Sequence, residues 1–242
     1  VDDLVWLKER YGAQSFFFTD ECFALSPTKR LCQQMIDRQV NVKWTCELRF
    51  EKNLTRELLG QMRDAGCLKI VFGLESFNQR VMDFMKKGIK QESVRRIVDD
   101  CVDLGIAVHC YVIVGFPTEK EEEALDTMNF VVGNKKLHES YGFSCQPCLF
   151  DLEKEAPIMS DPGSYGIRRI MRPATEDLSL GFFYEVQEGM TPAQAEQLYQ
   201  QVYEKISEVV CELPFNYSMA DGLLYIARAK SQALQVPQPT GS

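Results

Sequence analysis

Short apolar runs alternate with longer amphipathic stretches over the first 150 residues, an order that is typical of β–α–β units and a parallel sheet. The runs predict five strands, at 15–19, 40–50, 68–74, 106–114 and 143–150. Helices are predicted between them: one opened by Ser26 and Pro27, one capped by Thr55, and others over 78–86, 92–104 and 120–132. Alternating strands and helices predict an α/β fold, either a barrel or a doubly wound sheet.

The pattern changes after about residue 150. Turn residues lead into two segments, 165–171 and 180–186, that we expect to pair as short strands. Thr191 and Gln194 have the spacing of a capping box for a helix that reaches about Cys211. A polar, Pro-rich tail closes the chain.

We therefore expect three regions. The first is a partial barrel over 1–150. The second is a C-terminal extension over 151–235, made of the short hairpin and two helices, the last of them over 217–233. The third is a disordered tail over 236–242.

Composition narrows the class of protein. The 242 residues carry 27 Lys and Arg against 35 Asp and Glu, and 45% are hydrophobic, which suits a globular chain with one large α/β unit. The net charge of −8 argues against binding to nucleic acid. A membrane span needs roughly 18 uninterrupted apolar residues, and none is present. The start at Val1 lacks a signal sequence and an initiator Met, so we expect a fragment of a larger protein.

Nine cysteines lie scattered through segments that read as helices and strands. This distribution differs from the loop-borne disulfide framework of small secreted proteins, and it predicts a reducing, cytoplasmic setting.

Polar and turn-forming residues stand where each predicted strand ends, and the carboxyl ends of parallel strands share one edge of a sheet. These residues are Thr19, Asp20, Glu21, Glu47, Arg49, Glu75, Ser76, Gly115, Pro117, Glu119, Gln146 and Asp151. Any one of the charges alone reads more simply as a solvated loop residue or a helix cap. Their recurrence over five consecutive strands favours a ligand pocket.

Several motifs occur in an order and spacing that resemble the radical S-adenosylmethionine (SAM) superfamily. They are Phe18–Phe23, Trp44–Arg49, Met62–Cys67, Phe72–Ser76, Met85–Gly88 and Val112–Glu119. The chain is most similar to the large branch whose members often carry an N-terminal cobalamin-binding domain. The resemblance covers about residues 1–150 and implies a partial (β/α)6 barrel, of which this chain supplies strands two to six.

The resemblance also implies roles for individual residues. Asp20 and Glu21 correspond to positions near the amino group of the SAM methionine. Glu47 and Arg49 stand where the third barrel strand meets the cavity, and the planar guanidinium of Arg49 suits the methionine carboxylate.

Glu75 and Ser76 close the next strand, where relatives contact the ribose or methionine of SAM. The turn with Gly115 and Pro117 lies on the adenine side, and the backbone from Gln146 completes that pocket. Gly115 and Pro117 can equally serve only as a strand-to-helix turn.

The chain departs from the family pattern in one respect. The defining C-x-x-x-C-x-x-C loop, which holds a four-iron, four-sulfur cluster, is absent, and none of the nine cysteines reproduces its spacing. Cys145 and Cys148 form a C-x-x-C pair, but on a strand residues three apart point to opposite faces. We therefore expect no metal ligands in this chain, and we read the pair as structural.

The leading interpretation is the SAM-binding part of a radical SAM enzyme. In the intact parent, the resemblance implies reductive cleavage of SAM to a 5′-deoxyadenosyl radical, an iron–sulfur cluster, a cobalamin in some members, and an electron donor such as flavodoxin or ferredoxin. The alternative is a noncatalytic binding or scaffold module. A third reading is a hydrolytic or lyase barrel that uses Asp20, Glu47 and Glu75.

The substrate is a small molecule or peptide that the sequence does not identify, and no catalytic residue is assigned. We look for substrate contacts within 151–190, at Tyr165, Arg168, Arg169, Arg172 and the aromatic run 182–184. A surface hairpin that packs its own aromatic residues explains the same pattern. We expect the chain alone to be catalytically silent.

Overall fold

The computed structural model describes residues 1–20, 22–134, 136, 143–172 and 181–209. Its larger sheet contains five strands: β1 (Ser15–Phe17), β2 (Lys43–Leu48), β3 (Cys67–Glu75), β4 (Ala107–Val114) and β5 (Phe143–Leu149). The α-helices are α1 (Asp2–Tyr11), α2 (Leu25–Asp37), α3 (Arg56–Asp64), α4 (Gln79–Phe84), α5 (Gln91–Asp103), α6 (Glu121–Gly133) and α8 (Pro192–Val209). The predicted last helix and the whole of the predicted tail fall, with Glu21 and His138, outside the described residues.

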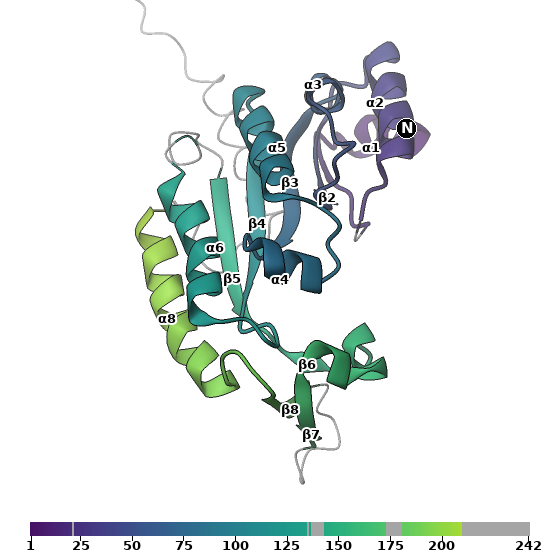
Figure 1. The fold of residues 1–242 in the computed structure, drawn as a ribbon. Helices are drawn as coiled ribbons and strands as arrows, with labels where there is room; N and C mark the ends of the chain where they lie inside the picture. Colours follow the sequence, from purple (N-terminus) through teal and green to yellow (C-terminus); the bar gives the residue numbers. More distant parts are fainter. Residues whose placement is uncertain (21, 135, 137–142, 173–180, 210–242) are drawn as a thin grey trace, which may run out of the picture.

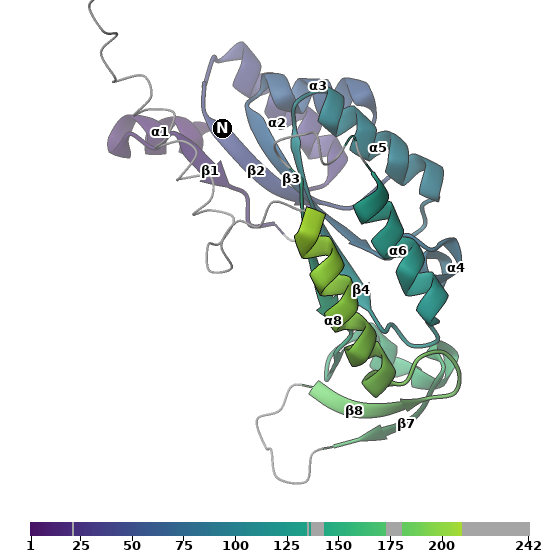
Figure 2. The same cartoon turned by 90° about the vertical axis from the view of Figure 1, so that its left-hand side faces the viewer.

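The five strands lie in the order β1-β2-β3-β4-β5, and every neighbouring pair is parallel. All five therefore end at one edge of the sheet. Helices α2, α3, α5 and α6 lie along one face (Figure 2), and α8 packs against α6, β4 and β5. The predicted α/β class is confirmed. The sheet is open, and β1 and β5 are its two outermost strands.

The core lies between this sheet and its helices. Trp44 of β2 is fully buried, and its indole N–H donates a hydrogen bond to the Ala65 carbonyl at 2.9 Å. Five free cysteines are buried in the same core: Cys32, Cys46, Cys67, Cys101 and Cys110. Burial raises the pKa of Cys32 and of Cys101 to about 12, so these thiols are held protonated as small apolar groups.

Helix starts agree with the sequence at most positions. Thr55 caps α3 by accepting from the Leu58 N–H, and Thr191 and Gln194 form the expected capping box at α8. The start predicted at Ser26 and Pro27 is wrong. The helix already begins at Leu25 after an extended Ala24, whose carbonyl accepts from the Thr28 hydroxyl, so the proline lies within the first turn.

A second, three-stranded sheet follows the carboxyl end of β5 (Figure 1). Its strands are β6 (Leu152–Glu153), β7 (Ile167–Met171) and β8 (Gly181–Val186), in the order β6-β8-β7 with antiparallel pairing, and two short 3₁₀ turns precede β7, η1 (Pro157–Ser160) and η2 (Pro162–Tyr165). The segments predicted to pair as a hairpin correspond to β7 and β8.

Two glycines allow close contact between this small sheet and the turn after β4. A Cβ atom at Gly166 would lie 2.4 Å from Thr118 Cγ2, and one at Gly189 would lie 2.5 Å from the Thr118 carbonyl carbon. Both glycines have positive φ, at 71° and 82°. The Met190 N–H also donates to the Glu119 carbonyl at 2.8 Å. The residues that flank the small sheet thus contact the turn after β4, through the Thr118 methyl group and the main chain.

Within the described part of the chain, no helix is long and apolar enough to cross a membrane.

Candidate functional site

The edge where the five strands end carries a cluster of charged side chains. Glu75 is the last residue of β3, Arg49 follows β2, and Lys87 lies in the loop after α4. The Lys87 ammonium is 3.3 Å from the Glu75 carboxylate and donates to the Gly73 carbonyl at 3.3 Å. Arg49, Gly73 and Lys87 line one small cavity. The sequence predicted Arg49 and Glu75 at this edge but missed Lys87.

Glu75 adopts an unusual backbone conformation. Its φ is +61°, a region that a residue with a side chain rarely enters. Its carboxylate folds back over Gly73, where an added Cβ would lie 2.7 Å from Glu75 Oε1. Such strain persists only where surrounding contacts hold it, and here the ion pair with Lys87 is one of them.

The pKa of Lys87 depends on the burial and the charges around it. Burial lowers its pKa, the Glu75 carboxylate opposes that change, and the Arg49 guanidinium adds to it. Two cations and one carboxylate therefore lie close together in a partly desolvated place. This set of charged groups fits a ligand with both a carboxylate and an ammonium group, because the Arg49 guanidinium, which pairs with no carboxylate among the described residues, can bind the first and the Glu75 carboxylate the second.

The face of the sheet opposite the helices carries further polar side chains near this edge. Burial raises the pKa of Tyr111 on β4, and the charges of Glu47, Cys148 and Glu75 raise it further. Side chains from four adjacent strands therefore lie within electrostatic reach of one another. Sequence reasoning found Glu47 and Glu75 but missed Tyr111, whose direction depends on the register of β4.

A second polar group lies nearer the start of the strands. Ser144 of β5 is held between Lys69 of β3 and His109 of β4, with its hydroxyl 3.0 Å from Lys69 Nζ and 2.8 Å from His109 Nδ1. Burial lowers the pKa of Lys69 to about 8. Burial, assisted by the Lys69 charge, lowers the pKa of His109 to about 3, so its ring is neutral at physiological pH.

The turn after β4 is built around a buried acid. Gly115 has φ +86°, and its N–H donates to Glu119 Oε2 at 2.7 Å. Burial raises the pKa of Glu119 to about 8. Pro117 is buried in the same turn. Gly115 and Pro117, both predicted as site residues, therefore fix the backbone conformation of this turn.

The other predicted residues lie apart from the charged cluster. Asp20 is exposed after β1, and Gln146 is exposed on β5 opposite Tyr111. Ser76 is fully buried, where its hydroxyl lies 3.3 Å from the Thr127 hydroxyl of α6 and accepts from the Asn78 N–H. The Ser76 side chain thus faces the helix layer and anchors the turn.

The C-x-x-C pair of β5 behaves as expected of residues three apart on a strand. Cys145 packs against the apolar core, while Cys148 is exposed and donates to the Val112 carbonyl. Among the residues that the structure describes, no three His, Cys, Asp or Glu side chains are placed to hold a metal ion. These residues therefore do not fit an iron–sulfur cluster.

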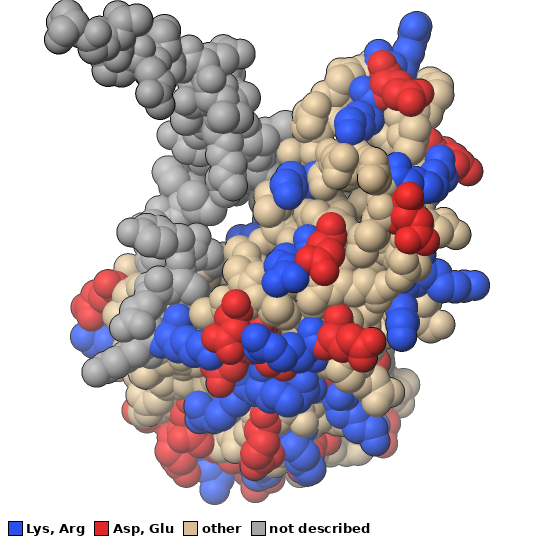
Figure 3. All heavy atoms as spheres, turned by 90° about the horizontal axis from the view of Figure 1, so that it is seen from above, with Lys and Arg blue, Asp and Glu red and all other residues tan. Residues whose placement is uncertain are grey.

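Charges on the surface are mixed. Figure 3 shows Lys and Arg interleaved with Asp and Glu on the face seen from above. Ion pairs join Arg56 to Asp100 and Asp103, and Asp103 to Lys136. Interleaved charges of this kind do not form the continuous basic track that a nucleic-acid backbone requires.

Comparison with known proteins places this chain in a family. Residues 1–131, more than half of the chain, match the sequence profile of the Radical SAM superfamily. The chain belongs to the radical SAM superfamily. In this family, SAM and a four-iron, four-sulfur cluster are the expected cofactors.

Two curated relatives are methyltransferases. The chain is 27% identical over 143 residues to an uncharacterized methyltransferase of Pyrococcus horikoshii, covering 58% of this chain and 30% of the relative. It is 26% identical over 121 residues to cytidylyl-2-hydroxyethylphosphonate methyltransferase of Streptomyces wedmorensis, covering 48% of this chain and 22% of the relative. The chain therefore matches less than a third of either relative's length.

Solved structures show the same fold. The radical SAM methyltransferase TsrM of Kitasatospora setae, bound to tryptophan and a SAM analogue, superposes with a TM-score of 0.60 at 15% identity, over 86% of this chain and 45% of that one. The coproporphyrinogen III oxidase HemN of Escherichia coli, a radical SAM enzyme, superposes with a TM-score of 0.53 at 14% identity, over 86% and 45%.

Proposed function

We propose that this chain is the SAM-binding barrel portion of a larger radical SAM enzyme, with the site at the edge where the five strands end. The cluster of Arg49, Glu75 and Lys87 is the observation that carries the proposal, because it offers the guanidinium of Arg49 and the anchored carboxylate of Glu75 to a zwitterionic ligand. The methionine part of SAM is such a ligand.

Each residue has a defined task in this proposal. Arg49 binds the methionine carboxylate through two parallel N–H groups, and Glu75 accepts hydrogen bonds from the methionine ammonium. Lys87 holds the Glu75 carboxylate over Gly73, and both Lys87 and Gly73 line the small cavity. SAM, when bound, supplies the group that is transferred or activated.

The remaining predicted residues complete the site. Glu47 and Gln146 line the sheet beside Tyr111, while Gly115 and Pro117 shape the turn on the adenine side. Asp20 and Glu21 extend the site at β1. We assign the iron–sulfur cluster and a cobalamin to other parts of the larger enzyme, and the electron donor, such as flavodoxin or ferredoxin, to a separate partner protein.

We propose methyl transfer to a small molecule as the reaction class. Both curated relatives named above are methyltransferases, and TsrM is one too. The small sheet is placed to contact the substrate, because it follows directly from the edge that carries the charged cluster (Figure 1).

The test is equilibrium binding of SAM to the larger enzyme, measured by titration calorimetry on purified variants. Glu75→Gln and Arg49→Ala should each weaken SAM binding roughly 10- to 150-fold, since each removes a charged hydrogen-bond partner. Asp83→Asn is the matched control, because Asp83 is exposed and bonds only to Gln79 and Lys90 among the described residues. Unchanged affinity in both site variants, with normal melting curves, would refute the assignment of the site.

A further inference from the structure

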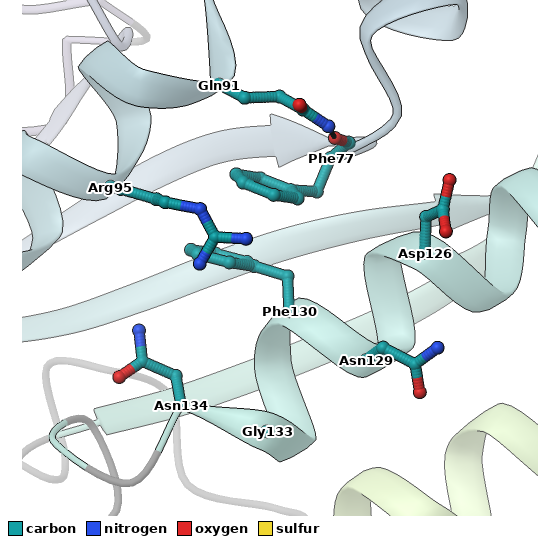
Figure 4. A pocket seen from close by; sticks show the side chains of 8 residues that line it. All are labelled: Phe77, Gln91, Arg95, Asp126, Asn129, Phe130, Gly133 and Asn134. Atoms are coloured by element: carbon teal, nitrogen blue, oxygen red, sulfur yellow. Dashed lines mark hydrogen bonds between the residues drawn. The ribbon is translucent and has the colours of Figure 1, made fainter.

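A cavity of about 440 Å³ lies outside the sheet, between α5 and α6 (Figure 4). It is lined by Phe77, Gln91, Arg95, Asp126, Asn129, Phe130, Gly133 and Asn134. None of these residues belongs to the charged cluster at the strand ends. The cavity is therefore separate from the proposed SAM site.

The cavity wall is built on a rigid aromatic pair. The rings of Phe77 and Phe130 are stacked 3.8 Å apart and nearly parallel, and both are buried. The Arg95 guanidinium lies 4.6 Å from the centre of the Phe77 ring and 5.2 Å from that of Phe130. The pair thus holds the guanidinium in place by cation–π contact, which reduces the entropy that it would lose on binding a ligand.

Arg95 differs from its neighbours in having no anionic partner. Arg96 pairs with Asp100 and donates to the carbonyls of Lys52 and Leu54. Arg80 is likewise paired with Glu123. Among the described residues, no carboxylate lies within ion-pair distance of Arg95, so its planar donors face the cavity free to bind an oxyanion.

The opposite wall favours a different chemical group. Figure 4 shows Asp126 across the aromatic rings from Arg95, with the Asn129 side chain on the same helix. Asn78 donates to one oxygen of Asp126 at 2.8 Å, which fixes the carboxylate and leaves its other oxygen to accept a hydrogen bond. A carboxylate at this wall repels a dianion such as phosphate but attracts an ammonium or amide N–H.

We propose that this cavity binds a small carboxylate that also carries an N–H donor, the chemistry of an α-amino acid or of the C-terminal residue of a peptide. The carboxylate pairs with Arg95, and the N–H group faces Asp126. The cavity lies directly behind the turn at Glu75 and Ser76, because Phe77 follows that turn and its N–H donates to Thr127 of α6. A ligand there would contact Phe77, two residues after the strand that ends in Glu75.

The test is an NMR titration of the ¹⁵N-labelled chain with L-serine, read on the side-chain amides of Gln91 and Asn129. A saturable shift is expected below about 20 mM, the range of a weak small-molecule site. Acetate and ethanolamine, which each carry half of the recognised chemistry, should bind at least tenfold more weakly than L-serine, and so should inorganic phosphate. N-acetyl-L-serine separates the two sources: equal binding identifies a peptide terminus, and weaker binding identifies a free amino acid.

Variants locate the site. Arg95→Gln should weaken L-serine binding at least tenfold, while Arg95→Lys keeps part of it. Arg63→Gln is the control, because it removes the same charge from α3, where Arg63 pairs only with the adjacent Asp64 among the described residues. Asp126→Asn should weaken L-serine without weakening acetate. The proposal is overturned if Arg95→Gln binds as tightly as the unaltered chain, if phosphate binds as well as L-serine, or if no shift saturates.

Discussion

The ammonium of Lys87 lies 3.3 Å from the carboxylate of Glu75, although the two residues are twelve positions apart in the sequence, one before and one after helix α4. Positive φ at Lys86 and Gly88 turns the chain back after α4 and brings Lys87 over β3. The pair fixes a glutamate whose own backbone is strained. Lys87 is therefore a positioning residue for the proposed SAM site.

Replacing Lys87 tests this role. Lys87→Met should weaken SAM binding roughly 10-fold, because Glu75 loses the partner that holds it, and Lys87→Arg should restore most of the affinity. The measurement is calorimetry on the larger enzyme, with melting curves to show that both variants fold. If the Lys87→Met and Lys87→Arg variants bind SAM with equal affinity, the ion pair between Lys87 and Glu75 does not contribute to SAM binding.

Glu119 predicts a pH dependence of stability. Its folded pKa of about 8 lies above the ordinary 4.5, so the folded state holds a proton that the unfolded chain releases, and stability falls as pH rises from about 5 to 8. Glu119→Gln removes this loss and should stabilise the chain by up to roughly 4 kcal/mol at pH 9, with little change at pH 5. Urea unfolding at both pH values measures the difference.

The matched control for Glu119 is Glu122→Gln, an exposed acid on the first turn of α6. It should leave the pH profile unchanged. Neighbouring charges on Glu123 and Arg80 remain in both variants, so they do not account for a difference between them. A Glu119→Gln profile parallel to that of the unaltered chain would show that Glu119 is already ionised at neutral pH.

The partly buried His109 predicts that the stability of the fold decreases, at acid pH, as the pH falls. Its folded pKa of about 3 lies below the ordinary 6.5, so the unfolded chain takes up a proton that the folded chain refuses, and stability is lost as pH falls from about 6.5 toward 3. His109→Gln should flatten this part of the profile by a few kcal/mol at about pH 4. NMR titration of the His109 ring gives a direct check, and protonation near pH 6 in the folded state would contradict the prediction.

Gly115 predicts a steric effect on stability. A Cβ atom there would lie 2.4 Å from the Ala195 Cβ of α8, and the φ of +86° is unfavourable for alanine. Gly115→Ala should therefore destabilise the chain by roughly 2–4 kcal/mol. Adding Ala195→Gly should recover the part that comes from the clash but not the backbone strain.

The control for Gly115 is Gly60→Ala in α3, where an added Cβ meets nothing within 4 Å. Helix propensity alone predicts that this substitution stabilises the chain by about 1 kcal/mol. Thermal melting of all four variants provides the comparison. Additive losses for Gly115→Ala and Ala195→Gly would mean that the two positions do not touch.

The sequence predicts the sheet well because the apolar runs and the helix caps are local signals. Thr55, the Thr191 box and the position of Arg49 after β2 could all be located in this way. The same reasoning places Ser76 beside Glu75 at the site but cannot show that its side chain turns to α6. The direction of each side chain after a strand end depends on φ, and the positive φ of Glu75 has no sequence signature.

Contacts between strands were the part that the sequence could not supply. Lys69, His109 and Ser144 come together only because three parallel strands set their register, and each residue alone looks ordinary. Lys87 left one signal, its place in the segment Met85–Gly88 that resembles the family. Arg95, which has no carboxylate partner among the described residues, left none, because the partners of a helix residue depend on how the helices pack.

The contact of the small sheet with Thr118 has a consequence for how this sequence can vary. The contacts run from Gly166 and Gly189 to the main chain and methyl group of Thr118, so they do not depend on which side chains β7 and β8 present to solvent. Exposed residues such as Phe183 and Arg169 can therefore be replaced without displacing the carboxyl ends of the strands in the larger sheet. Under the proposed function, the exposed side chains of the small sheet can therefore vary while the charged cluster at the strand ends keeps its geometry.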